Sequence, residues 1–268
     1  MGPARLEAEV LLSAATGWAR ARLMTYPERV VPQGPRRRFE HWVERRVRDR
    51  VPLQYLTHRQ EFWSLDLYVD ERTLIPRPET ECLVEELLRR AGPHPETWLD
   101  VGTGSAAVAL ALAAARPDCR VIGLDISPGA LQVAALNRRR HPGPGARVWL
   151  LASDLLQAVQ VRRGVVNRIA ANLPYLSAAE IPTLEPEVSK HEPRRALVAG
   201  ENAAALILRL LPQAADLLAA GGTLHLEMAP PLGAAITAAL RDSGRFSAAE
   251  IRRDGLGLER IVSAVRLP

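Results

Sequence analysis

From residue 97 onward, patterns typical of buried strands alternate with patterns typical of helices, and this alternation limits the possible folds more than any other feature. Short apolar runs predict strands at residues 97–101, 120–125, 146–152, 167–172 and 222–228, then an antiparallel pair at 246–251 and 259–265. Apolar residues spaced by three or four predict helices at residues 105–115, 128–139, 203–218 and 232–243. Strands that alternate with helices imply an α/β fold with a mostly parallel, doubly wound sheet, which binds ligands at the carboxyl ends of its strands.

The first 78 residues follow a different pattern. Between Leu6 and Arg50, apolar residues recur every three or four positions among Arg and Glu, which is typical of short amphipathic helices packed together. Residues 61–69 predict a strand or hairpin, and Pro76 and Pro78 delay the next helix until Glu79. We therefore expect a helical N-terminal domain at residues 1–58, a hairpin linker at 59–78 and the α/β domain at 79–268.

Composition limits the compartment and the partners of the chain. The net charge of +5 comes almost wholly from arginine, because Lys190 is the only lysine, and a solvated arginine-rich surface explains it better than a nucleic-acid partner. Cys82 and Cys119 belong to no cluster with metal-ligand spacing, so we expect a reduced, cytoplasmic protein without a metal site. Glu7 and Glu9 stand where a signal peptide would need an apolar core, and no uncharged stretch approaches the ~20 residues of a membrane span.

A glycine loop follows the first strand of the alternating region, in the segment Asp100-Val101-Gly102-Thr103-Gly104. The missing side chains of the glycines let the backbone turn sharply and pass close to a ligand. Asp125 ends the next strand, where its carboxylate can accept both hydroxyl hydrogens of an adenosine ribose. The spacing of Gly102, Gly104 and Ala107 also fits a dinucleotide fingerprint. The loop alone therefore leaves S-adenosylmethionine, a nicotinamide or flavin nucleotide, and a purely structural turn as alternatives.

A further acidic residue follows the third strand. The carboxylate of Asp154 could accept a hydrogen bond from an adenine amino group at the same edge of the sheet. A solvated loop residue or a helix cap explains Asp154 equally well, so the sequence leaves both interpretations open.

The segment Asn172-Leu173-Pro174-Tyr175 follows the fourth strand and so belongs to the same edge as the glycine loop. An amide or aromatic amine has its lone pair delocalised into a π system, so its methylation needs acceptors that favour a pyramidal NH2 group. The side-chain oxygen of Asn172 and the carbonyl of Leu173, whose peptide Pro174 fixes, can be these acceptors, and Tyr175 offers an aromatic surface. Alone, the segment could be a polar turn with a packed tyrosine. Behind a glycine loop it favours methyl transfer from S-adenosylmethionine to a planar nitrogen, a reaction that depends mainly on positioning and electrostatics.

With these motifs, nearly the whole chain resembles the release-factor glutamine methyltransferases, the HemK/PrmC family. The most diagnostic further match is Pro76-Arg77-Pro78-Glu79-Thr80-Glu81, because unrelated amine methyltransferases are not expected to carry it before the glycine loop. The other matches are Pro52-Leu53-Gln54-Tyr55-Leu56, Glu61-Phe62, Asp125-Ile126-Ser127-Pro128, Glu192-Pro193-Arg194-Arg195-Ala196-Leu197, the helix before Gly221-Gly222, and Glu227.

The resemblance implies a Rossmann-like class I S-adenosylmethionine-dependent methyltransferase domain and a small helical N-terminal domain that helps to hold a protein substrate. The implied reaction methylates the side-chain amide N5 of the glutamine in the Gly-Gly-Gln motif of class I peptide chain release factors. Arg77 and Glu79 are expected beside the cofactor, although an exposed ion pair at a helix start explains them as well. The implied cofactor contacts are Asp100, Gly102, Gly104, Asp125, Asp154 and Asn172; the implied substrate contacts are Asn172, Leu173, Pro174, Tyr175 and Arg77, with Asn172, Pro174 and Tyr175 as the catalytic group.

Two residues depart from the family's pattern. Leu173 stands where the family's clamp usually carries a proline, and Asn-Leu-Pro-Tyr resembles instead the clamp of ribosomal RNA adenine dimethyltransferases. Ala106 stands where the glycine loop usually has a further glycine, and we expect its methyl group close to the cofactor. The alternatives are therefore adenine N6 methylation of RNA or DNA and a non-catalytic, translation-associated binding protein of the same fold. Our leading expectation is a cytoplasmic monomer that acts on class I release factors, without stable nucleic-acid binding or membrane association.

Overall fold

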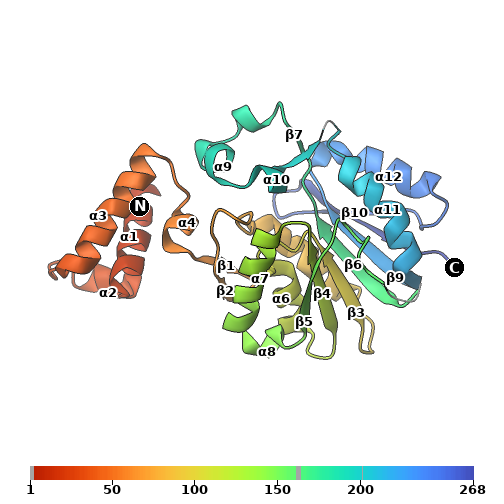
Figure 1. The fold of residues 1–268 in the computed structure, drawn as a ribbon, viewed down its shortest axis with the longest axis horizontal. Coiled ribbons are helices and arrows are strands. Elements are labelled where there is room, and N and C mark those ends of the chain that lie inside the picture. Colours follow the sequence, from red (N-terminus) through yellow and green to blue (C-terminus); the bar gives the residue numbers. More distant parts are fainter. Residues whose placement is uncertain (1–2, 161–163, 201) are drawn as a thin grey trace.

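The computed structural model describes residues 3–160, 164–200 and 202–268. A seven-stranded sheet with helices on both faces forms the larger part, and a group of N-terminal helices stands beside it (Figure 1). The predicted α/β fold with a mostly parallel sheet is confirmed.

The central sheet has the strand order β10-β11-β9-β6-β3-β4-β5. The pairings of β11 with β10 and with β9 are antiparallel, and the other pairings are parallel. β5 begins two residues later and β6 one residue earlier than predicted, and two other strands differ more. β9 begins four residues early, and the predicted strand at 246–251 is reduced, because Phe246 makes only an isolated bridge to Arg266 while its side chain is buried in the core. The strands are β3 (Thr97–Val101), β4 (Arg120–Asp125), β5 (Val148–Ala152), β6 (Val166–Asn172), β9 (Leu218–Glu227), β10 (Glu250–Arg253) and β11 (Glu259–Val265).

The chain reverses its direction of travel across the sheet at β3. It passes outward from β3 to β4 and β5, then returns to place β6 on the other side of β3. The carboxyl ends of β3 and β6 are adjacent, with Val101 opposite Ala171. This is the topological switch point at which doubly wound sheets bind ligands.

Helices cover both faces of the sheet and pack their apolar residues against it. α6 begins two residues later than predicted, because Thr103 to Ala106 form a tight turn before it. The helices of this part are α5 (Glu81–Arg89), α6 (Ala107–Ala115), α7 (Pro128–Arg140), α8 (Pro142–Gly145), α9 (Pro186–His191), α10 (Arg194–Leu197), α11 (Ala205–Leu217) and α12 (Gly233–Asp242). Shorter elements are the 3-10 turns η1 (Pro78–Thr80), η2 (Ile181–Thr183) and η3 (Pro230–Leu232), and the paired strands β7 (Leu176–Ser177) and β8 (Val198–Gly200).

The N-terminal helices pack on each other and on the linker. The predicted hairpin is present as two short antiparallel strands, and the hydroxyl of Tyr55 donates to the carbonyl of Thr73 at 2.6 Å, which ties α4 to the linker. Residues 1–2 of the predicted N-terminal domain lie outside the described ranges. The elements are α1 (Pro3–Thr16), α2 (Arg20–Thr25), α3 (Gln33–Arg48), α4 (Leu53–Thr57), β1 (Gln60–Phe62) and β2 (Leu65–Leu67).

Asn172-Leu173-Pro174-Tyr175 is called the clamp from here on. Ion pairs join the N-terminal helices to the segment that follows the clamp. Glu187 at the start of α9 accepts from Arg46 at 2.5 Å and from Arg50 at 2.8 Å. At the other end of α9, the imidazole Nε2 of His191 lies 2.7 Å from the carbonyl of Asp49. Among the described residues, no helix is long and apolar enough to cross a membrane.

Candidate functional site

The glycine loop and the Asn-Leu-Pro-Tyr segment line one cavity of about 500 Å³ at the carboxyl ends of β3 and β6. The loop contributes Asp100 to Ser105, and the segment contributes Asn172, Leu173 and Pro174. The sequence separates these motifs by about seventy residues, and the switch point brings them together.

The glycine loop is held close to the clamp. Gly102 has φ +78°, which favours glycine, and the main-chain N–H groups of Gly102 and Thr103 both donate to the carbonyl of Leu124. A Cβ on Gly102 would lie 3.2 Å from the carbonyl oxygen of Asn172 and 3.3 Å from Cδ2 of Leu173. Glycine is therefore required here both for the backbone conformation and for the close approach to the clamp.

Asp100 braces the loop from below. Its Oδ2 accepts from the Thr103 hydroxyl at 2.6 Å and from the main-chain N–H of Ala109 at 3.2 Å. Burial raises the pKa of Asp100 to about 6. Asp100 lines the cavity, but its hydrogen bonds serve the loop and the first turn of α6.

Asp125 ends β4 at the rim of the cavity. Oδ2 accepts from the N–H of Gly104 at 2.9 Å, and Oδ1 accepts from the N–H of Ser127 at 2.9 Å. Burial raises the pKa of Asp125, against hydrogen bonds from these backbone groups that lower it. A carboxylate offers about four acceptor positions, so Asp125 keeps capacity for the hydroxyl groups of a ribose.

Ile126 and Arg209 also line the cavity, beside the predicted acids, although the sequence analysis gave neither a role. Ile126 follows Asp125 and is 52% exposed, so it offers an apolar surface at the mouth of the cavity. Asp154 also lines the cavity, where its Oδ2 accepts from Arg209 of α11 at 2.7 Å. An apolar side chain directly after a strand-ending Asp was a signal for Ile126, whereas no local pattern indicated Arg209.

Asn172 is held from behind by residues of two other elements. Its Nδ2 donates to the Thr80 hydroxyl at 3.2 Å, so Oδ1, at the opposite end of the amide, is turned away from Thr80. Glu227, the last residue of β9, is the register partner of Asn172 and is 3% exposed. Tyr175 is half-buried and lies outside the lining of the cavity, and burial raises its pKa.

Arg77 also lines the cavity, and its partner is not Glu79. The guanidinium pairs with Glu192, a buried carboxylate that also accepts from the N–H of Ile75 at 3.3 Å. Burial raises the pKa of Glu192, and the charge of Arg77 lowers it. The alternative of an exposed ion pair between Arg77 and Glu79 is therefore wrong. Arg77 joins the linker to the segment after the clamp.

The expected position of the Ala106 methyl group is also wrong. Ala106 adopts a left-handed conformation with φ +65°, is fully buried, and packs into the core with Trp98 and the residues of α6. It is absent from the residues that line the cavity. The alanine therefore strains the backbone of the loop but does not add bulk beside a ligand.

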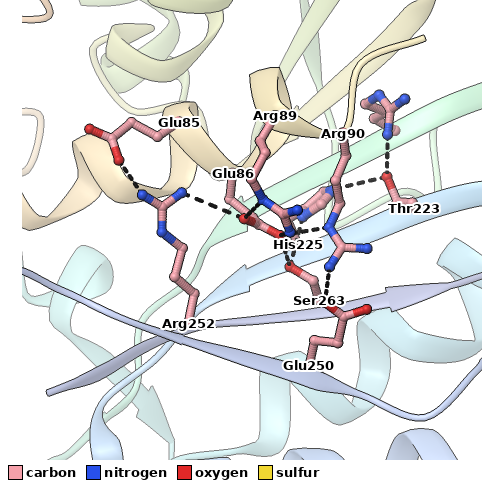
Figure 2. A network of polar contacts seen from close by, with 10 residues as sticks. Glu85, Glu86, Arg89, Arg90, Thr223, His225, Glu250, Arg252 and Ser263 are labelled. Atoms are coloured by element: carbon pink, nitrogen blue, oxygen red, sulfur yellow. Dashed lines mark hydrogen bonds and ion pairs between the residues drawn. The ribbon is translucent and has the colours of Figure 1, made fainter. Parts of the chain in front are cut away.

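A second polar cluster lies under α5 (Figure 2), and its residues do not line the cavity. Glu86 accepts from Arg89, from Arg90 and, at 3.3 Å, from the hydroxyl of Ser263, which in turn lies 2.9 Å from Nδ1 of His225. Burial lowers the pKa of His225 to about 3, so this histidine is neutral. The cluster anchors α5 to β9 and β11.

The cavity suits a nucleoside with a charged side chain. Its volume of about 500 Å³ is in the range of cofactor sites, and it combines a glycine backbone, a strand-ending carboxylate and apolar walls. Within residues 3–160, 164–200 and 202–268, no group of three or more His, Cys, Asp or Glu is placed to hold a metal ion.

Sequence comparisons identify relatives that match almost the whole chain. A model of the PrmC N-terminal domain matches residues 1–57, and a model of a methyltransferase domain matches residues 99–191. The release factor glutamine methyltransferase of Moorella thermoacetica is 42% identical over 264 residues, which are 98% of this chain and 91% of that protein. The protein of the same name from Salmonella typhimurium is 38% identical over 257 residues, 96% of this chain and 90% of that protein.

Solved structures show the same fold at lower identity. A methyltransferase from Pyrococcus furiosus superposes with a TM-score of 0.54 and 18% identity, covering 76% of this chain and 90% of that one. Ribosomal protein L11 methylase from Lactobacillus delbrueckii subsp. bulgaricus superposes with a TM-score of 0.51 and 21% identity, covering 72% and 81%. These likenesses concern the fold alone.

Proposed function

Because the chain belongs to the release factor glutamine methyltransferase family, we propose that it methylates the side-chain amide N5 of the glutamine in the Gly-Gly-Gln motif of class I peptide chain release factors. The observation that carries the proposal is the meeting of Asn172 and the glycine loop at one cavity. This arrangement supports methyl transfer to a planar nitrogen.

The cofactor is S-adenosylmethionine, which supplies a methyl group on an activated sulfonium. We assign the ribose hydroxyls to Asp125 and the close backbone approach to Gly102 and Gly104. Asp154, already paired with Arg209, is proposed for the adenine amino group. Asp100 would act on the cofactor mainly by holding the loop.

The clamp would act on the substrate amide. Oδ1 of Asn172 and the carbonyl of Leu173 accept the two amide hydrogens, which favours a pyramidal nitrogen whose lone pair faces the methyl group. Pro174 fixes the peptide that carries the second acceptor, and Tyr175 supports the clamp from outside the cavity lining. Arg77 is proposed to contact the protein substrate near its pairing with Glu192.

The helical N-terminal domain at residues 1–58 is proposed to hold the release factor, with residues 59–78 as a linker and 79–268 as the catalytic domain. We further propose a monomer that works in the cytoplasm, where release factors act, without stable nucleic-acid binding. The relatives do not favour adenine methylation of RNA or DNA.

The test is a methyl-transfer assay with labelled S-adenosylmethionine and a purified class I release factor, compared with its Gln→Ala version by mass spectrometry. Label on the Gly-Gly-Gln glutamine, and none on the changed protein, is the expected result. Asn172→Ala should abolish turnover and leave the cofactor Kd nearly unchanged. Intact cofactor binding without glutamine labelling, or labelling of RNA in its place, would contradict the proposal.

A further inference from the structure

A buried polar chain lies behind the side chain of Asn172. The amide Nδ2 of Asn172 donates to Oγ1 of Thr80, which is 5% exposed and stands in η1. Glu227 lies beside Asn172 as its register partner on β9 and is 3% exposed. Hydrogen bonds from the side chains of Thr80 and Asn172 lower the pKa of Glu227, so both groups donate toward its carboxylate. Three elements, η1, β6 and β9, thus meet at this chain.

The directions of these hydrogen bonds are fixed by the chemistry of the groups. An ionised carboxylate only accepts, and a hydroxyl has a single hydrogen to donate. The Thr80 hydroxyl that donates to Glu227 must therefore accept from Asn172, and only Nδ2 of Asn172 can donate to it. The carboxylate at one end determines which end of the amide is left for the substrate.

We propose that Glu227 is a positioning residue that acts directly and through Thr80 to keep Oδ1 of Asn172 directed at the substrate amide. This inference rests on the proposed function, because it needs an NH2 group as the target of the methyl transfer. Glu227 is not among the residues that line the cavity, so it acts on the orientation of Asn172 and not on the reacting atoms.

Protonation of Glu227 would reverse the chain. A protonated carboxyl group can donate to Thr80, whose hydroxyl is then free to donate to Oδ1 of Asn172. The amide would turn its NH2 group toward the substrate NH2 group, and two donors would face each other. The competent form is therefore the ionised one.

The surroundings of Glu227 bring this change near neutral pH. Burial raises its pKa to about 7, and Oε2 is buried without a hydrogen-bond partner among the described residues. Glu79 raises the pKa further, and Arg260 opposes it. The charged and titratable groups that interact with Glu227 are Glu79, Cys82, Tyr175 and Arg260.

The sign of the pH dependence follows. As the pH falls through about 7, Glu227 takes up a proton and kcat should fall. The fall of kcat on the low-pH side of its pH profile is called the acidic limb. At saturating cofactor and saturating release factor, kcat reports only the protein with both ligands bound. Protonation of Asp125 or Asp100 in the ligand-free protein, which would weaken cofactor binding, therefore does not affect kcat. Glu227→Gln should remove this acidic limb and lower kcat roughly 10- to 100-fold. This is the range over which activity falls when a residue that orients a metal ligand is lost, and Glu227 would orient Asn172 in the same indirect way.

Two changes at Thr80 test the link in the chain. Thr80→Val removes the hydroxyl at similar size and should lower kcat with the cofactor Kd unchanged, by less than Glu227→Gln because the direct contact of Asn172 with Glu227 remains. Thr80→Ser keeps the hydroxyl and should retain both the activity and the acidic limb.

Glu86→Gln is the matched control. Glu86 is 2% exposed and lies over the same face of the sheet as Glu227. It contacts Ser263, the register partner of His225 (Figure 2). His225 comes two residues before Glu227 on β9, so both side chains point to the same face. This variant should unfold at a lower temperature and keep the acidic limb of kcat.

The failures of the two proposals are distinguishable. A wild-type enzyme that methylates glutamine, with a Glu227→Gln variant that keeps the same acidic limb and kcat, would overturn the positioning role alone. A Glu227→Gln variant that loses cofactor binding in proportion to kcat would also overturn it. A wild-type enzyme that labels no glutamine would instead remove the proposed function.

Discussion

The carboxylates around the cavity have different surroundings, although the sequence presents each of them in the same way, at the end of a strand. Asp100 is fully buried and its hydrogen bonds go to the loop, whereas Asp125 stands at the rim with acceptor capacity to spare. The half-buried carboxylate of Asp125 is the one suited to a ligand, because its charge remains partly solvated without one.

Asp125→Ala should weaken S-adenosylmethionine binding by about 1.5 to 3 kcal/mol, or about 10- to 150-fold in Kd, because a charge-assisted hydrogen bond to the ribose is lost. Isothermal titration calorimetry checks this. Asp118→Ala is the control, since Asp118 precedes β4 at the opposite end of that strand and pairs with Arg116. Equal Kd values for Asp125→Ala and the unchanged protein would reject the assigned contact.

The glycine loop and the clamp are packed as one unit. The position of a Cβ on Gly102, 3.2 Å from the carbonyl oxygen of Asn172, leaves no free space between the end of β3 and the end of β6. The carbonyl of Asn172 belongs to the peptide bond between Asn172 and Leu173. The carbonyl of Leu173 is the second proposed acceptor for the substrate amide. Displacement of the loop should therefore displace the clamp.

Gly102→Ala should lower cofactor affinity and kcat together, because the new methyl group meets the clamp. Gly221→Ala is a matched control: Gly221 has φ +79°, close to the φ +78° of Gly102, but a Cβ there meets nothing within 4 Å. Each change costs about 1–2 kcal/mol of folding free energy from the left-handed backbone, partly offset by the lower entropy of the unfolded chain. If Gly221→Ala impaired kcat as much as Gly102→Ala, the clamp contact would not be the cause.

The sequence predicted most elements and the meeting of the two motifs, because apolar periodicity and the edge of a parallel sheet are readable locally. It did not predict the chain from Asn172 to Thr80, whose members are separated by 92 residues, or the pairing of Asp154 with Arg209 of α11. The direction of the Ala106 methyl group depends on a left-handed backbone that no periodicity indicates. Such features arise from tertiary packing between segments that are far apart in the sequence.

One short helix, α9, connects the N-terminal helices with the cavity. α9 belongs to the segment after the clamp, which lies between the N-terminal helices and the sheet (Figure 1). Glu187 at its start pairs with Arg46 and Arg50, and Glu192 just after its end pairs with Arg77 at the cavity. A partner held by the N-terminal helices would therefore be held at a fixed position relative to the clamp.

Glu187→Gln should raise the KM for the release factor, since the N-terminal helices lose part of their attachment while the cavity is untouched. A loss of about 1 kcal/mol in positioning corresponds to about fivefold in KM. Although burial raises it, hydrogen bonds from Arg50 and Arg46 lower the pKa of Glu187 to about 2. The attachment is therefore complete above the unfolded-state pKa near 4.5 and lost only as the pH falls through about 2, so it is intact under assay conditions.

Steady-state kinetics with varied release factor, beside calorimetric titration of the cofactor, separate the two sites in this experiment. Glu44→Gln is the control, because Glu44 pairs with Arg48 within α3 and does not reach the rest of the molecule through that pair. A raised KM for Glu187→Gln with an unchanged cofactor Kd would support substrate holding by the N-terminal helices. An unchanged KM would mean that the ion pairs of α9 do not position the substrate, and an equal rise in both variants would trace the effect to surface charge.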